Sequence, residues 1–334
     1  IEIVRLKDKF GTRQLPTAEL ILHGTKARLI SQPGKGVKSI VPMLHVTRYY
    51  NAIASVGAMR RMLAIGRDFS FRRTAFGKLI QDQPLHILIL AKFEVKYRGC
   101  FAFISKMSQL LGKIEAKIAT QQDEALFRLF NPVMKMYTAK ESMLWMSEGM
   151  ELFGGVGYME NSNIPVILRD CQVTPIWEGT TNVMSLDVLR ALKSLGPAGL
   201  ASIEEYMDQV ITKAKATFAN IDEIIDLLKL QKKRLYSLVT GEKAQRAELY
   251  ARALGFQLGR VFIGIILLEI LALSKDSTEL DFLKFWLDLE SKSEEEIDYN
   301  LDTLKKYALD LNSEGKPKHS GNLACNGKNR AKIQ

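Results

Sequence analysis

The chain has 334 residues, a formal net charge of +10 and an ordinary apolar content of 47%. A chain of this length can bury a sizeable core, and three widely separated cysteines argue against a disulfide-stabilised scaffold and favour a reducing intracellular compartment, mitochondrial or cytoplasmic. The four histidines show no metal-binding helical spacing, so we expect no metal site.

The positive charge is concentrated near the start of the chain. Residues 1–100 hold 18 Lys and Arg against 6 Asp and Glu, whereas the remainder holds 29 against 31. A basic surface of this kind suits the phosphates of a nucleotide cofactor, a nucleic acid or an acidic partner. A solvated basic face explains it equally well.

The first forty or so residues predict strands, and the rest of the chain predicts helices. Short, partly alternating apolar runs at 1–6, 17–24 and 26–31 are typical of strands separated by turns. From about Leu44 onward, apolar residues recur every three or four positions, which predicts long packed helices. These helices are expected at 47–71, 84–117, 124–153 and 182–193.

The later part of the chain predicts a second helical block. The segment "SLGPAGL" at 194–200 predicts a break, and helical patterns resume over roughly 201–312. Its most apolar run, "VFIGIILLEILAL" at 261–273, is too short to span a bilayer and carries Glu269, so we interpret it as a buried helix. The basic tail at 315–334 is expected to be disordered.

Two glycine-bearing segments could bind a ligand or simply end a helix. "FRRTAFGKLIQDQP" at 71–84 offers two guanidinium groups that could hold a pyrophosphate. "MELFGGVGYMENSNIP" at 150–165 has three glycines, which permit close approach of a ligand or another chain. Taken alone, each pattern is more typical of a helix terminus.

A third segment, "TPIWEGTTNV" at 174–183, places Glu178 just before a predicted helix that Thr180 or Thr181 would cap. A carboxylate shielded by Ile176 and Trp177 would make a suitable general base, because partial desolvation raises its proton affinity. A surface acid near a helix dipole is the alternative, and the segment alone favours it.

Together and in this order, the "RxxFG" turn, "LFGGVGY", "PVILRDC" and "WEGTTNV" resemble the C-terminal half of the acyl-CoA dehydrogenase family over residues 1–193. Within that family, the helical block after 200 most resembles the branch with the bacterial alkylation-response flavoprotein. The resemblance implies a mostly α fold. Its parts would be the remnant of a small antiparallel middle β domain (1–43), a C-terminal helical bundle with the catalytic base (44–195), an additional helical block (196–314) and the tail.

The resemblance also implies residue roles. Glu178 would be the catalytic base for α,β-dehydrogenation of an acyl-CoA thioester, with FAD accepting the hydride. Substrate would contact Thr47, Arg48 and Gly179, within "LHVTR" at 44–48 and the Glu178 segment. FAD would contact Arg73, Phe76, Gln83, Glu151, Leu152, Phe153, Gly154, Gly155, Thr180, Thr181 and Asn182.

The resemblance further implies partners and leaves alternatives open. It implies a homotetramer, an electron-transfer flavoprotein as acceptor, and further domains before Ile1. One alternative is an alkylation-response-type flavoprotein that binds nucleic acid with little dehydrogenase activity, although no helix-turn-helix or zinc pattern supports it. Another is a catalytically incomplete oligomerisation fragment.

Overall fold

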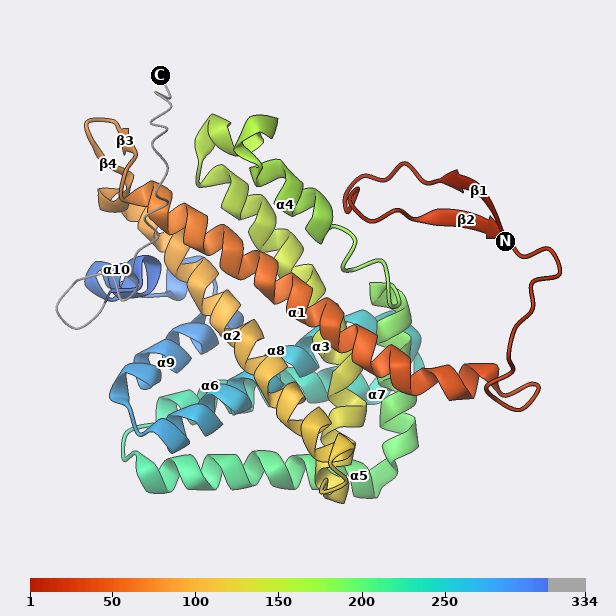
Figure 1. The fold of residues 1–334 in the computed structure, drawn as a ribbon. Helices are drawn as coiled ribbons and strands as arrows, with labels where there is room; N and C mark the ends of the chain where they lie inside the picture. The colour runs from red at the N-terminus through yellow and green to blue at the C-terminus, as the bar shows by residue number, and fades with distance from the viewer. Residues whose placement is uncertain (312–334) are drawn as a thin grey trace.

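The computed structural model describes residues 1–311, and long helices dominate it (Figure 1). Its strands form two small antiparallel hairpins, β1 with β2 and β3 with β4. The mostly α-helical fold predicted from the sequence is therefore confirmed. In chain order the elements are β1 (Glu2–Leu6), β2 (Ala18–Ile21), α1 (Gly36–Ser70), β3 (Thr74–Ala75), β4 (Lys78–Leu79), η1 (Ile80–Asp82), α2 (Pro84–Glu115), α3 (Gln121–Glu151), η2 (Gly154–Tyr158), η3 (Glu160–Ser162), α4 (Ile164–Cys171), α5 (Thr181–Thr217), α6 (Asp222–Val239), α7 (Gly241–Gln245), α8 (Ala247–Ser274), α9 (Ser277–Ser291), η4 (Glu294–Glu296) and α10 (Leu301–Leu309).

Helices α1, α2 and α3 pack against one another and form the first part of the core. Apolar residues at three- and four-residue spacing give each helix a buried stripe, with Met59 on α1, Phe93 on α2 and Phe130 on α3 fully buried. Each such side chain contributes roughly 1.5–3 kcal/mol when it is removed from water. This three-helix layer is the support on which the candidate site is built.

Helix α8 lies at the centre of the C-terminal helices. It is the one helix among the described residues that is long and apolar enough to cross a membrane, but 72% of its most apolar window is buried inside the protein. The ring of Phe262 stacks on Phe130 of α3, with the ring centroids 3.6 Å apart. The buried helix predicted at 261–273 is confirmed.

Local capping explains where several helices begin. Thr120 and Asp123 form a reciprocal capping box at the start of α3, with bonds of 3.1 and 3.0 Å. Pro84 opens α2, where its missing N–H group is not needed. The side chain of Thr180 caps α5, as the sequence predicted.

Two local predictions differ from the structure, and a third is confirmed. Residues 26–31 form no strand, and within the described chain Ile30 is 97% exposed with no neighbouring strand to pair with. The first long helix begins at Gly36, before the predicted start near Leu44. The predicted break at 194–200 is confirmed, because α5 consists of two helical segments that meet in a kink at non-helical Gly196 (φ 61°, ψ −171°).

The division of the chain into parts at 43/44, 195/196 and 314/315 stays a prediction. Helix α1 begins before the first of these boundaries, and α5 runs through the second at the Gly196 kink. The tail predicted to be disordered at 315–334 lies outside the described residues.

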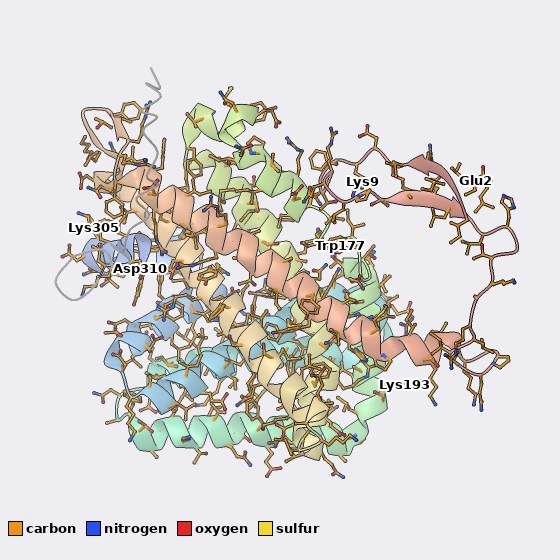
Figure 2. The ribbon with its side chains drawn as sticks, viewed as in Figure 1. Glu2, Lys9, Trp177, Lys193, Lys305 and Asp310 are labelled. Atoms are coloured by element: carbon orange, nitrogen blue, oxygen red, sulfur yellow. The ribbon has the colours of Figure 1, made fainter. Side chains whose placement is uncertain are left out.

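The N-terminal hairpin projects from the helical body, with Lys9 on the loop nearest the helices and Glu2 near the far end (Figure 2). The backbone N–H of Thr12 donates to Oδ1 of Asp170, at the end of α4, over 2.6 Å. Gly11 permits this contact, because a Cβ atom there would lie 2.1 Å from the carbonyl oxygen of Arg169.

Candidate active site

The Glu178 segment is a constrained loop between α4 and α5. Glu178 and Gly179 both adopt positive φ angles, 58° and 101°. Such a conformation is uncommon for glutamate and persists only where the surroundings hold it. The side-chain amide of Asn51 on α1 donates to the carbonyl oxygen of Thr174 over 3.0 Å, which ties the start of the loop to the helical layer.

Two side chains from the helical layer hold the tip of this loop. The hydroxyl of Thr47 on α1 donates to Oε2 of Glu178 over 2.5 Å. The ammonium of Lys135 on α3 donates to the carbonyl oxygen of Gly179, also over 2.5 Å. Of the predicted residues, Thr47, Glu178, Gly179 and Thr180 are thus brought together.

The predicted shielding of Glu178 by its sequence neighbours is wrong within this chain. Ile176 is 55% exposed and Trp177 39% exposed, because the loop turns both away from the helical layer. Figure 2 shows Trp177 on this loop. Glu178 itself is half-buried, and it is α1 and α3 that supply its contacts.

Arg48 lies beside the loop but is already paired. Its guanidinium donates to Asp187 on α5 over 2.7 Å, and both side chains are only 13% exposed. Arg128 on α3 makes a longer contact of 3.4 Å to the other oxygen of Asp187. Burial and the neighbouring Arg48 charge lower the pKa of His45, which favours its neutral form.

Sequence reasoning missed Lys135. Its side chain is fully buried, and burial together with the nearby Arg48 charge lowers its pKa to about 8, while Glu178 opposes that shift. A lysine within the apolar run "NPVMKMYTA" of a buried helix was a signal that could have identified it.

A second set of residues predicted to contact FAD lies at the other end of α1. Phe76 is 98% exposed at the tip of the β3–β4 hairpin, and the amide of Gln83 donates to Ala75 O over 3.3 Å. Leu152 and Phe153 are buried against α1 beside Gly66. Their side chains therefore belong to the core, and only their backbone could face a cofactor. Glu151, Gly154 and Gly155 are exposed, and Arg73 is an exposed residue of the hairpin.

The predicted cofactor residues thus form two groups. Thr180, Thr181 and Asn182 open α5 near Thr47, whereas the hairpin follows Ser70 at the far end of α1 (Figure 1). The helix between Thr47 and Ser70 is roughly 35 Å long. One FAD molecule does not span that distance, so the two groups of a single chain do not form one site. Thr181 is buried, and Asn182 accepts from Arg252 over 2.9 Å.

Comparisons with known proteins match this arrangement to one family. Residues 34–193 match the family model "Acyl-CoA dehydrogenase, C-terminal domain". "Acyl-CoA dehydrogenase family member 11" of Caenorhabditis elegans is 41% identical over 80% of this chain and 44% of its own length.

The chain belongs to the acyl-CoA dehydrogenase family.

Two further acyl-CoA dehydrogenase relatives refine the comparison. "Putative acyl-CoA dehydrogenase AidB" of Escherichia coli is 30% identical over 69% of this chain and 41% of its own length. The crystal structure of C. elegans ACDH-11 in complex with C11-CoA superposes with a TM-score of 0.80 at 36% identity, over 90% of this chain and 51% of that one. The chain therefore spans less than half the length of the two curated relatives.

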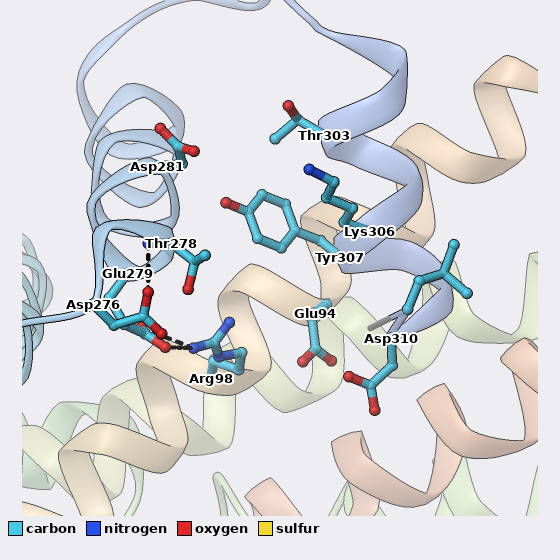
Figure 3. Close-up of a pocket in the computed structure, with 11 residues that line it drawn as sticks. Glu94, Arg98, Asp276, Thr278, Glu279, Asp281, Thr303, Lys306, Tyr307 and Asp310 are labelled. Atoms are coloured by element: carbon cyan, nitrogen blue, oxygen red, sulfur yellow. Dashed lines mark hydrogen bonds and ion pairs between the residues drawn. The ribbon is translucent and has the colours of Figure 1, made fainter. Parts of the chain in front are cut away.

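A polar cavity of about 540 Å³ lies away from the dehydrogenase-type loop, between α2, α9 and α10 (Figure 3). Arg98 donates to both oxygens of Glu279 on its wall, over 2.8 and 2.9 Å. Arg67 binds Glu94 over 2.7 Å and the carbonyl oxygen of Ala308 over 2.8 Å. The bonds of Arg98 join α2 to α9, and those of Arg67 join α1 to α2 and to α10. No predicted site residue lines the cavity.

Proposed function

We propose that the protein to which this chain belongs is an FAD-dependent acyl-CoA dehydrogenase in which Glu178 is the catalytic base. The observation that carries the proposal is the held carboxylate, which Thr47 binds on a loop whose backbone Lys135 holds. A base must be fixed within hydrogen-bond reach of the proton it removes. Membership of the family supports the same assignment.

Each residue has a distinct part in the proposed reaction. Glu178 takes the proton from the carbon next to the thioester carbonyl, and the electron pair of that C–H bond becomes the new double bond. FAD supplies the acceptor for the hydride that leaves the adjacent carbon. Thr47 orients the carboxylate before substrate arrives. Gly179 lets the loop keep this shape, because its φ of 101° favours glycine and a Cβ atom there would lie 2.5 Å from the terminal methyl of Met184.

The residues present fit FAD if two copies of the chain contribute. The exposed Phe76 on the hairpin and the exposed backbone at Gly154 and Gly155 suit the adenine end. Thr180 at the start of α5 offers a helix N-terminus to the cofactor's phosphates. Because these groups lie at opposite ends of α1, we propose that FAD binds between subunits of a homo-oligomer, a tetramer by family resemblance.

The test uses the full-length protein reconstituted with FAD. Glu178→Gln should slow flavin reduction by acyl-CoA about 10²–10⁴-fold while FAD content is retained, because the amide cannot accept the proton. The C11-CoA bound by the C. elegans neighbour makes acyl groups of similar length the first substrates to mix, anaerobically, with both proteins. Equal bleaching of the flavin in wild type and variant would remove Glu178 from the chemistry. An electron-transfer flavoprotein is the proposed acceptor.

A second candidate function is nucleic-acid binding, favoured by the excess of basic residues over 1–100. If that surface binds phosphates of DNA, the affinity for duplex DNA should fall steeply as salt is added, because bound counterions are released. Absence of binding at low salt would leave the phosphates of FAD and CoA as the use of these residues.

A further inference from the structure

Lys135 is a buried ammonium group with a single backbone acceptor. It projects from the middle of α3, is 0% exposed, and donates over 2.5 Å to the carbonyl oxygen of Gly179. Within residues 1–311 it has no salt-bridge partner, although Glu178 lies close enough to favour its charge. A buried charge without a paired carboxylate opposes folding, so its position calls for another explanation.

The carbonyl group that Lys135 binds is the one that fixes the direction of the loop. Glu178 and Gly179 are consecutive residues with positive φ, and the peptide group between Gly179 and Thr180 leads directly into the cap of α5. Rotation of that peptide group would turn the backbone of Glu178 away from Thr47. A charge-assisted bond is roughly twice as strong as a neutral one, so an ammonium donor is well suited to hold it.

We propose that Lys135 is the positioning residue of the catalytic loop: its charged form holds the Gly179 carbonyl and thereby keeps the Glu178 carboxylate aimed at the substrate. The proposal rests on the function proposed above. The hydroxyl of Thr47 and the ammonium of Lys135 then hold the loop from two helices, one through the side chain of the base and the other through its backbone.

The charge of Lys135 gives the proposal a measurable pH dependence. The charged groups facing it are Arg48 from α1 and Glu178 from the loop, and Arg48 is in turn paired with Asp187 from α5. Burial and Arg48 lower the pKa of Lys135 to about 8. As pH rises through that value the ammonium becomes a neutral amine, the bond to Gly179 weakens, and the rate of flavin reduction should fall.

The experiment compares Lys135→Met with Lys140→Met in the full-length FAD-loaded protein, because Lys140 is an exposed lysine on the same helix. Lys135→Met should reduce flavin about 10²-fold more slowly, as misplacement of a base by roughly 1 Å does, with FAD content and oligomer mass unchanged. It should also lose the fall in rate near pH 8 and show a larger isotope effect with α-deuterated acyl-CoA. Lys140→Met should match wild type in the rate of flavin reduction, in its pH dependence and in the isotope effect.

Hydrogen exchange provides a readout that does not depend on activity. Amides of residues 176–183, in the loop and at the start of α5, should exchange faster in Lys135→Met than in Lys140→Met. Amides of α3 should exchange at the same rate in both variants. Lys135→Gln keeps a neutral donor and should give an intermediate rate that does not change near pH 8. The proposal would be overturned if Lys135→Met reduced its flavin and exchanged its loop amides at wild-type rates. It would also be overturned if both Lys135 variants lost FAD and failed to assemble. If wild-type flavin is not reduced by any acyl-CoA, the proposed function fails, and exchange in the loop alone decides the role of Lys135.

Discussion

Asp187 accepts from two arginines at once, Arg48 at 2.7 Å and Arg128 at 3.4 Å, on the face of α5 that packs against α1 and α3. Its side chain is 13% exposed. A buried carboxylate in this position contributes little net free energy as a pair, but its removal leaves two guanidinium groups without a counter-charge.

We therefore expect Asp187→Asn to be strongly destabilising. The free energy of unfolding should fall by about 3–5 kcal/mol, measured by denaturant titration of the full-length protein. Asp226→Asn is the matched control, because Asp226 pairs with Lys229 on the exposed side of α6 and should cost about 0–1 kcal/mol. If the two variants lose the same unfolding free energy, Arg48 and Arg128 find other partners when Asp187 is removed.

At the residue scale, the sequence predicted local features such as helix caps better than contacts between distant residues. A cap at Thr180 or Thr181 follows from the local pattern, since a cap involves neighbours only a few positions apart, whereas the role of Glu178 was implied only by the family resemblance. The Thr47–Glu178, Lys135–Gly179 and Arg48–Asp187 contacts join residues far apart in the chain. No local pattern encodes such contacts, so the sequence indicated neither the pairing of Arg48 with Asp187 nor the contact of Lys135 with the Glu178 loop.

At the scale of an element, α5 is a helix with a required glycine. Gly196 has φ 61° and ψ −171°, and a Cβ atom added there would meet nothing within 4 Å. Gly196→Ala should therefore destabilise through backbone strain alone, by about 1–3 kcal/mol. Gly57→Ala, in helical α1 with equally open surroundings, should instead stabilise by about 0.4–1 kcal/mol. Thermal unfolding should show a lower melting temperature for Gly196→Ala and a higher one for Gly57→Ala than for wild type. A stabilising effect of Gly196→Ala would contradict the expected backbone strain.

The elements themselves were largely predictable because their apolar residues repeat every three or four positions. The helices expected at 84–117 and 124–153 correspond closely to α2 and α3. The break predicted at 194–200 is present as the kink at Gly196, since glycine and proline disfavour a helix locally. The strand expected at 26–31 failed because a strand needs a partner, which no local pattern reports.

At the scale of the whole molecule, a buried ionic cluster joins the later helices to the first three. Glu290 on α9 accepts from Arg260 on α8 over 2.7 Å and from Tyr137 on α3 over 3.3 Å, and it pairs with Lys96 on α2. Its side chain is 5% exposed. One carboxylate thus connects four helices, and it does so beside a hydrophobic core that residues after 200 share with the first three helices.

Glu290→Gln should weaken that connection in a pH-dependent way. Burial opposes the charge of Glu290, but Lys96 and Arg260 outweigh it and hold its pKa below the ordinary value. A carboxylate with a lowered folded-state pKa stabilises the protein above its unfolded-state pKa of about 4.3, and that contribution is lost as pH falls through the folded-state value. The variant should lose about 3–5 kcal/mol of unfolding free energy at pH 7, because the largely buried ammonium of Lys96 is left without its paired carboxylate.

The difference in unfolding free energy between wild type and Glu290→Gln should then become smaller below about pH 4, where wild-type Glu290 also becomes neutral. Denaturant titrations from pH 7 down to the acid transition measure it, with Glu223→Gln as the control, since Glu223 pairs with Lys284 at an exposed contact between α6 and α9. The control should stay within about 1 kcal/mol of wild type throughout. If the free-energy difference between wild type and Glu290→Gln does not change with pH, the side chain stabilises the protein through its packing. Its charge would then play no part in joining the later helices to the first three.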